Sequence, residues 1–240
     1  MSDATALAAN VLACVAMAVG AAAQASIGMG LNLFAVPILA LIDPVYVPGP
    51  VLLHSFLVAG AASYRLRADV NARELSISAA GLLAGTVLAA FLLTQLDSTH
   101  LPRVFGILVL AAVAITAAGY RITLTWRSLV AASATAGIMG TIAGVHGPPI
   151  ALLYQHESAQ RIRSALLPFF AFANSISLVA LVAIGMFGWR EIHASIVLLP
   201  GLVIGYLAAP WLIRHMSARV IRACILAISA ISGLALALKG

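Results

Sequence analysis

The stretch at residues 137–155, GIMGTIAGVHGPPIALLYQ, lies at the middle of the chain between strongly apolar segments. It combines four glycines with one histidine and two adjacent prolines. Pro148 and Pro149 remove two backbone donors, and the ring of Pro149 disfavours helical backbone at Pro148. The pattern predicts a helix that breaks near His146 and Gly147 and restarts with prolines in its first turn. Because broken backbone at membrane depth is tolerated only where it lines a cavity or packs in protein, this stretch is a candidate transport site.

Apolar runs long enough to cross about 30 Å of hydrocarbon recur along the whole chain of 240 residues. The chain is 63% hydrophobic and 8% charged, which excludes a soluble domain of this size. We therefore expect an all-α, polytopic protein of the cell (inner) membrane. The formal charge of +6 does not indicate nucleic-acid binding, because the arginines fall in short loops between apolar runs.

A second broken segment is predicted at residues 24–39, QASIGMGLNLFAVPIL, directly after a first apolar element at residues 6–23. Glycines allow the chain to bend there, as in the central stretch. The other helices are expected at roughly residues 50–65, 75–95, 101–119, 128–144, 148–156, 164–187, 193–213 and 219–238.

The chain divides into two related halves, residues 1–122 and residues 123–240, within one integral membrane domain. The pattern G-L-x-x-G-x-x-x-A-x-x-L that begins at Gly81 recurs 120 residues later, at Gly201. Small residues at such positions also recur by chance, since close helix packing favours them in any membrane protein.

Two further matches join the halves. At the offset of 120, residues 54–55 (His-Ser) fall on residues 174–175 (Asn-Ser). At an offset of 116, Gly28 in the first broken segment falls on Gly144 in the second. The two broken segments therefore correspond.

Basic residues distinguish the two sides of the membrane. Ten of the thirteen Lys and Arg residues fall in predicted loops after residues 65, 119, 156 and 213. Because basic loops stay in the cytoplasm, both termini are predicted to be extracytoplasmic. The ten residues are Arg65, Arg67, Arg73, Arg121, Arg127, Arg161, Arg163, Arg214, Arg219 and Arg222.

The orientation of the halves depends on the broken segments. If each returns to the side from which it came, each half crosses the membrane an odd number of times. The halves are then two inverted-topology repeats, whose broken or re-entrant segments meet near the midplane from opposite faces. Many secondary transporters that work by alternating access have this plan.

No Asp, Glu, Lys or Arg is expected deep inside a span, so a cation would find few of the oxygen ligands it needs. An anion is better served, because helix N-termini at the two breaks offer free N–H groups and a partial charge of about +0.5 each. Polar side chains at the same depth add donors. The predicted substrate-binding residues are Gln24, Ser26, Gly28, Gly30, Asn32, His54, Ser55, Thr141, Gly144, His146, Gly147, Asn174 and Ser175.

Each polar candidate has a structural alternative. The serine and threonine hydroxyls either bind substrate or bond back to their own helices, and the asparagines either bind substrate or join neighbouring helices. His146 either works in transport or caps a helix. His146 and His54 are the titratable groups expected at depth, and an imidazole titrates near neutral pH. We therefore hypothesise that His146, together with His54, couples anion movement to the proton gradient.

The segments ASIGMGLNLFAVPIL at residues 25–39 and GIMGTIAGVHGPPIALLY at residues 137–154 each lie in one half. With these motifs the chain resembles, over essentially its whole length, the TauE/SafE sulfite-exporter family, also called the 4-toluenesulfonate uptake permease family. The second motif is the stronger, and Met29 and Leu31 in the first stand where the family often has small residues. The resemblance implies a plasma-membrane transporter of sulfur-containing anions such as sulfite, sulfoacetate or other organosulfonates.

The leading expectation is a proton-coupled secondary transporter, and the alternative is an anion channel of the same architecture. An enzyme is not expected, because G-x-S-x-G is absent and His156-Glu157 is followed at position 160 by Gln160 instead of a second histidine. Cys14 and Cys224 are far apart in apolar segments, so no metal or cofactor is predicted. The expected partners are a small anion and the lipid bilayer, with a homodimer left open.

Overall fold

The apolar runs form helices in the computed structural model, which describes residues 3–27, 30–66, 69–97, 99–119, 122–215 and 217–239. Seven helical segments in this part of the chain are long and apolar enough to cross a membrane. The protein is an all-α polytopic membrane protein, as predicted. Its elements are α1 (Asp3–Ile27), α2 (Leu31–Ile42), η1 (Pro44–Tyr46), α3 (Gly49–Arg65), α4 (Ala72–Gln95), α5 (Leu101–Ala118), α6 (Trp126–Ala143), α7 (Gly147–Tyr154), α8 (Ala159–Ala183), α9 (Trp189–His215) and α10 (Ala218–Lys239).

Polar caps fix where several helices begin. The Asn71 side chain accepts a hydrogen bond from the Glu74 N–H at the start of α4, and Ser158 does the same for Arg161 at the start of α8. Thr125 and Ser128 form a reciprocal capping box at the start of α6. Each cap satisfies a backbone donor that the first helical turn leaves without a partner. These caps explain why the helices begin two to five residues before the positions that hydrophobicity alone predicts.

Both predicted breaks are present. The first separates α1 from α2, where Gly30 has φ 118°, and the second separates α6 from α7, where Gly144 has φ 77°. This left-handed backbone favours glycine, since a side chain would be strained. With 12 and 8 residues, α2 and α7 reach only about 18 and 12 Å at 1.5 Å per residue, well short of a bilayer crossing. Gly28, predicted at the first break, lies outside the described residues.

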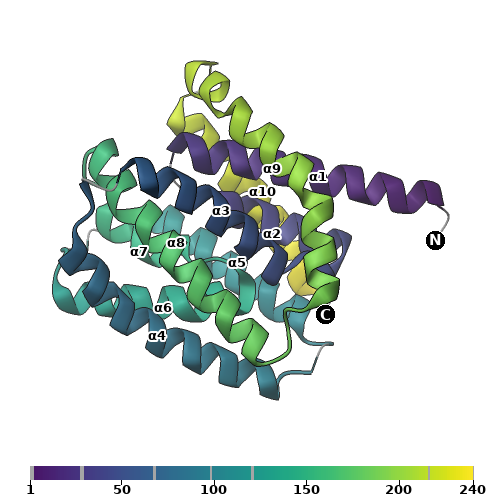
Figure 1. Cartoon of the computed structure of the whole chain (residues 1–240), viewed down its shortest axis with the longest axis horizontal. Helices are drawn as coiled ribbons and strands as arrows, with labels where there is room; N and C mark the ends of the chain where they lie inside the picture. The colour runs from purple at the N-terminus through teal and green to yellow at the C-terminus, as the bar shows by residue number, and fades with distance from the viewer. Residues whose placement is uncertain are drawn as a thin grey trace.

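Long helices from different halves pack in pairs: α4 runs along α6, and α1 runs along α9 (Figure 1). Glycines make both contacts close. A methyl group on Gly81 or Gly85 would overlap the backbone carbonyls of Val130 or Ala134 in α6. One on Gly201 or Gly205 would overlap those of Cys14 or Ala18 in α1. The recurring glycine pattern of the sequence therefore sets two close helix contacts, as small residues do in membranes.

Several other contacts between the halves follow the same exchange. α3 packs against α8 and α5 against α10, while α2 contacts α10 and α7 contacts α5. If α1 to α5 correspond to α6 to α10, exchanging the two sets returns the same list of contacts. This pattern supports the internal repeat, and the inversion of one half relative to the other stays a prediction.

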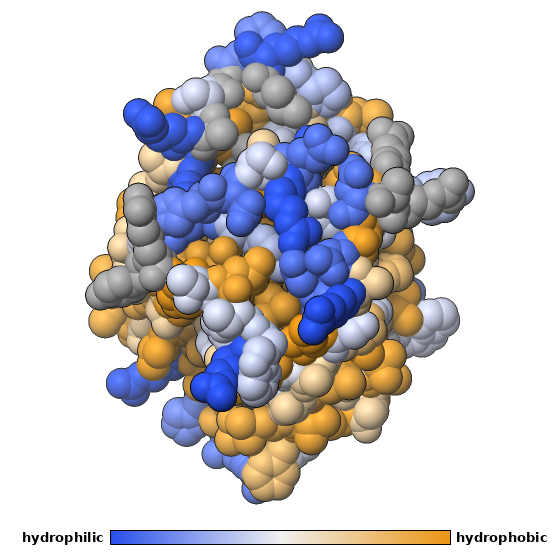
Figure 2. Space-filling model, turned by 90° about the vertical axis from the view of Figure 1, so that its left-hand side faces the viewer, coloured by the Kyte–Doolittle hydropathy of each residue, from blue (hydrophilic) through white to orange (hydrophobic). Residues whose placement is uncertain are grey.

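Apolar side chains cover the outward faces of the long helices, for example Val87 and Phe91 of α4 and Leu207 of α9, all exposed. Such surfaces suit contact with lipid tails. Figure 2 looks at the left-hand end of Figure 1, where the chain passes from α3 to α4 and from α7 to α8. Hydrophilic residues gather at the centre of this face, with apolar residues around and below them. The face is therefore an aqueous end of the molecule.

Candidate functional site

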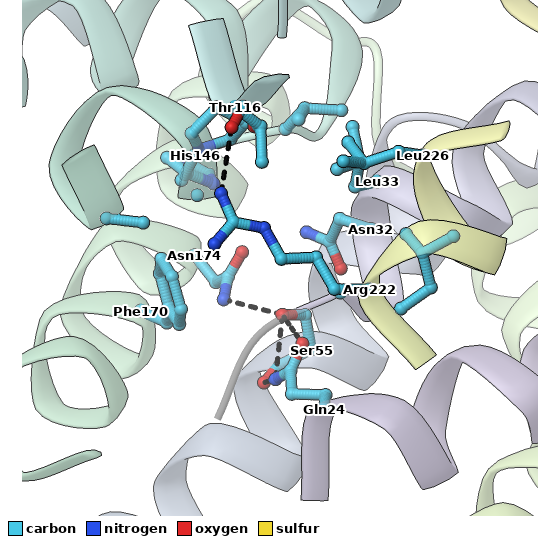
Figure 3. Close-up of a pocket in the computed structure, with 16 residues that line it drawn as sticks. Gln24, Asn32, Leu33, Ser55, Thr116, His146, Phe170, Asn174, Arg222 and Leu226 are labelled. Atoms are coloured by element: carbon cyan, nitrogen blue, oxygen red, sulfur yellow. Dashed lines mark hydrogen bonds between the residues drawn. The ribbon is translucent and has the colours of Figure 1, made fainter. Parts of the chain in front are cut away.

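A pocket lies where the two breaks meet, and its empty volume, including the open mouth, is about 600 Å³. Both halves of the chain line it, as do the first turns of α2 and α7 (Figure 3). Its polar lining contains seven of the thirteen predicted substrate-binding residues. These are Gln24, Gly30, Asn32, Ser55, His146, Gly147 and Asn174.

Neither half-helix start is capped by a side chain. Gly30, which has no side chain, occupies the N-cap of α2, and the side chain of His146 at the N-cap of α7 makes no hydrogen bond to the helix start. The first four N–H groups at a helix start, counted from the N-cap, have no partner within the helix. In α7 two of these positions are Pro148 and Pro149, which carry no N–H. The start of α2 therefore offers more backbone donors, whereas α7 contributes chiefly its dipole.

Gln24, Ser55 and Asn174 form a buried polar cluster on one wall of the pocket (Figure 3). Asn174 Nδ2 donates to Ser55 Oγ over 3.1 Å, and Gln24 Nε2 lies 3.4 Å from the same oxygen. The cluster joins α1, α3 and α8, so it holds elements of both halves together. Asn174 Oδ1 is buried with no hydrogen-bond partner among the described residues.

His146 heads a second buried chain of polar groups. Its Nε2 lies 3.0 Å from Ser177 Oγ, which lies 2.7 Å from Thr141 Oγ1. Thr141 in turn donates to Thr86 Oγ1 on α4 over 3.3 Å. His146 Nδ1 is buried without a hydrogen-bond partner in the described part of the chain. This row of hydrogen-bonded groups connects the pocket to the interior between α4, α6 and α8.

The two breaks are joined directly. Asn32 Nδ2 donates to the Gly144 carbonyl oxygen over 2.5 Å. The imidazole of His146 rests against Gly140, where an added methyl group would overlap the ring. Gly144 and Thr141 therefore do not line the pocket themselves. Gly144 holds Asn32 in place, and Thr141 is linked to His146 through Ser177.

Three predicted residues lie away from the pocket. The hydroxyls of Ser26 and Ser175 bond back to their own helices, at Ala22 O (2.6 Å) and Phe172 O (2.7 Å). His54 is buried, with Nδ1 2.6 Å from Pro50 O. The bonds of Ser26 and Ser175 are those of the structural alternative stated for the hydroxyls, and His54 lies outside the described pocket lining. Of the four residues aligned at positions 54–55 and 174–175, Ser55 and Asn174 are the two that meet.

Sequence reasoning missed three polar residues of the site: Ser177, Thr86 and Arg222. A helical signal existed for Ser177, because it lies one turn after Asn174 on the same face of α8. Arg222 was predicted in the cytoplasmic loop after residue 213, where the helix expected at residues 219–238 begins, and not in the pocket. It lies in α10 and lines the pocket, and its Nη2 donates to Thr116 O over 2.8 Å. The lining contains no Asp or Glu among the described residues, so the pocket is electropositive.

Residues 12–236 match the family model described as "Sulfite exporter TauE/SafE". The chain belongs to this family. Neither the curated proteins nor the solved structures gave a match. Membership in TauE/SafE agrees with the seven candidate spans and makes the protein a multi-pass membrane protein of a transporter family.

Proposed function

We propose that this TauE/SafE protein is a secondary transporter that moves a small sulfur-containing anion across the plasma membrane. Sulfite, sulfoacetate and other organosulfonates are the candidate substrates. One observation carries the proposal: the uncapped starts of α2 and α7, one from each half, face a single pocket that no described carboxylate lines. Helix starts without side-chain caps favour an oxyanion.

Alternating access is the mechanism that best suits this arrangement. The pocket lies between the two halves, and the helix contacts repeat when the halves are exchanged. Two inverted repeats that rock against each other would expose a central site first to one side and then to the other. The Asn32 bond to Gly144 O, which joins the two breaks, would hold the binding site together during this movement.

His146 is the residue that we assign to proton coupling. It lines the pocket, whereas His54 does not. An imidazolium at this position would attract the anion, and by linkage a bound anion would favour protonation of the ring. Proton and anion would therefore travel in the same direction.

An anion channel of the same architecture is the alternative. A channel would conduct ions in proportion to their concentration and give unitary currents, whereas a transporter saturates and exchanges substrate across the membrane. The two functions therefore differ in kinetics and can be separated in one preparation.

The test uses the purified full chain in proteoliposomes, with uptake of labelled sulfite and sulfoacetate measured against concentration. We expect saturable uptake, counterflow with unlabelled substrate, and faster uptake when the outside is made acidic. Uptake that rises linearly and is accompanied by unitary currents would favour the channel. Failure of every sulfur anion to enter would overturn the substrate assignment.

His146→Gln and His54→Gln form a matched pair for the coupling. Both replace a buried histidine, but only the first changes the pocket. We expect H146Q to remove the acceleration by acid outside, and H54Q to keep most of it. Full acceleration in H146Q would exclude His146 as the coupling residue.

A further inference from the structure

We infer that Arg222 is the fixed positive charge that binds the anion at the mouth of the pocket. This inference rests on the proposed function and adds the group that recognises the substrate's charge. Figure 3 shows the Arg222 side chain reaching from α10 across the pocket, with its guanidinium toward Thr116, His146 and Asn174. Arg222 is the one exposed residue of the described lining, which places it at the opening.

The guanidinium has donors to spare. Its hydrogen bond among the described residues goes from Nη2 to Thr116 O, and a guanidinium carries several further N–H groups arranged as a fork. The ion pair found in the described part of the chain joins Arg161 and Glu74, so no described carboxylate neutralises Arg222. A fork of this kind matches two oxygens of a sulfite or sulfonate group.

Asn174 can supply a further hydrogen-bond donor to the anion. Its amide is bonded to Ser55 Oγ, a hydroxyl that can either accept or donate. A half-turn of the amide keeps a bond to Ser55 and presents the NH₂ group in place of the partnerless Oδ1. The anion would then meet the Arg222 fork, this NH₂ group and the free N–H groups that start α2.

Arg222 is the one arginine or lysine among the described residues that line the pocket. Its charge therefore enters the pocket from one half of the chain only, through α10. A single guanidinium suits recognition of one anionic group.

A purely structural role for Arg222 makes a different prediction. Its bond to Thr116 O reaches the last turn of α5, where a cation stabilises the helix dipole. If that were its whole role, removing the charge would lower thermal stability and leave anion affinity unchanged.

The experiment measures binding of sulfite and of methanesulfonate to the full chain in nanodiscs, for R222Q, R222K and R219Q. Arg219 is the matched control, since it is exposed on the same helix and lies outside the pocket lining. We expect Kd to rise at least about tenfold in R222Q, the scale of a charge-assisted hydrogen bond. R222K should recover part of the affinity by restoring charge without the fork, and R219Q should bind as the unmodified chain.

Salt provides the second readout. Raising ionic strength should weaken binding to the unmodified chain and change binding to R222Q much less, because screening acts on the charge. Unchanged Kd in R222Q, or loss of thermal stability alone, would overturn the role of Arg222 while the proposed function stands. Absence of sulfite or methanesulfonate binding to the unmodified chain would overturn the substrate class and this inference together.

Discussion

The imidazole of His146 is positioned by a residue that has no side chain. Gly140 lies under the ring, and an added methyl group would overlap three ring atoms. The Gly140 carbonyl also accepts the Gly144 N–H over 2.7 Å, which closes α6 at the break. Space at position 140 therefore sets where His146 can reach both the pocket and Ser177.

We predict that Gly140→Ala separates transport from stability. Alanine favours a helix over glycine by about 0.5–1 kcal/mol, but here the methyl group would push His146 away from Ser177. The lost partner costs about 1–3 kcal/mol of stability, which the helix gain partly offsets. A misplaced His146 no longer serves the pocket, and because small misplacements of a functional group cost large factors in rate, we expect uptake in proteoliposomes to fall about tenfold or more. Gly60→Ala is the control, since an added methyl group at Gly60 meets open space, and it should keep the full rate. An unchanged rate in G140A would contradict this role for Gly140.

At the residue scale, the sequence predicted which residues are polar and buried better than it predicted which of them line the pocket. Seven predicted residues line the pocket. Four of them stand at the breaks, where irregular backbone creates a cavity, and the other three, Gln24, Ser55 and Asn174, are polar residues of the long helices α1, α3 and α8. Ser26 and Ser175 could not be distinguished from them, since a helix offers every hydroxyl its own carbonyl as partner. Arg222 was not expected in the pocket, because charge statistics assign an arginine to a side of the membrane and do not report how far its side chain reaches inward.

At the scale of elements, two helices that pack closely at a glycine cannot accept a larger side chain at that position. Gly85 of α4 and Gly205 of α9 occupy equivalent places at the offset of 120. A methyl group on either would overlap a backbone carbonyl of the partner helix, that of Ala134 or of Ala18. Backbone cannot move aside as a flexible side chain can.

We therefore predict that Gly85→Ala and Gly205→Ala destabilise the protein to a similar extent. Overpacking of this kind costs about 1–3 kcal/mol, and the thermal unfolding midpoint in detergent should drop by several degrees in both. Gly60→Ala, on an open helix surface, should hold or raise the midpoint. A drop in one variant without the other would show that the two contacts are not equivalent.

The elements themselves were largely predictable. Glycine and proline mark both breaks because few other residues permit such backbone, and the structure confirms a break at each place. The difference between the two half-helices can also be read from the sequence. Pro148 and Pro149 set the start of α7 and at the same time remove two of its N–H groups, so α7 offers fewer backbone donors than α2.

At the scale of the whole molecule, the arrangement of helices exceeds what a single sequence reveals. α1 pairs with α9 and α4 pairs with α6 because the glycines of one helix lie opposite the backbone of the other. A single sequence shows the glycines but not the helix that each of them faces. The charge of the loops supplies the orientation, since ten of thirteen basic residues were predicted on one side. Orientation and inversion are both predictions that labelling from one side of the membrane tests directly.

Single cysteines can test both at once in a chain whose own cysteines are replaced by serine. A serine at position 14 can still donate to Val197 O, as Cys14 Sγ does. Cys224 is exposed, so serine is tolerated there. Pro44 follows α2 and Glu157 follows α7, and both residues are exposed. If the halves are inverted, these equivalent positions lie on opposite sides of the membrane.

We predict that an impermeant maleimide added to intact cells labels Pro44→Cys and leaves Glu157→Cys unlabelled until the membrane is opened. Thr99→Cys, exposed between α4 and α5, should label from outside as Pro44→Cys does, because α3 and α4 form a return crossing. The physical reason is that basic residues keep the loop after α7 in the cytoplasm, while each short half-helix returns to its side of entry. Labelling of both Pro44→Cys and Glu157→Cys from outside would mean that the halves run in parallel, and a rocking mechanism built on inverted repeats would then be wrong.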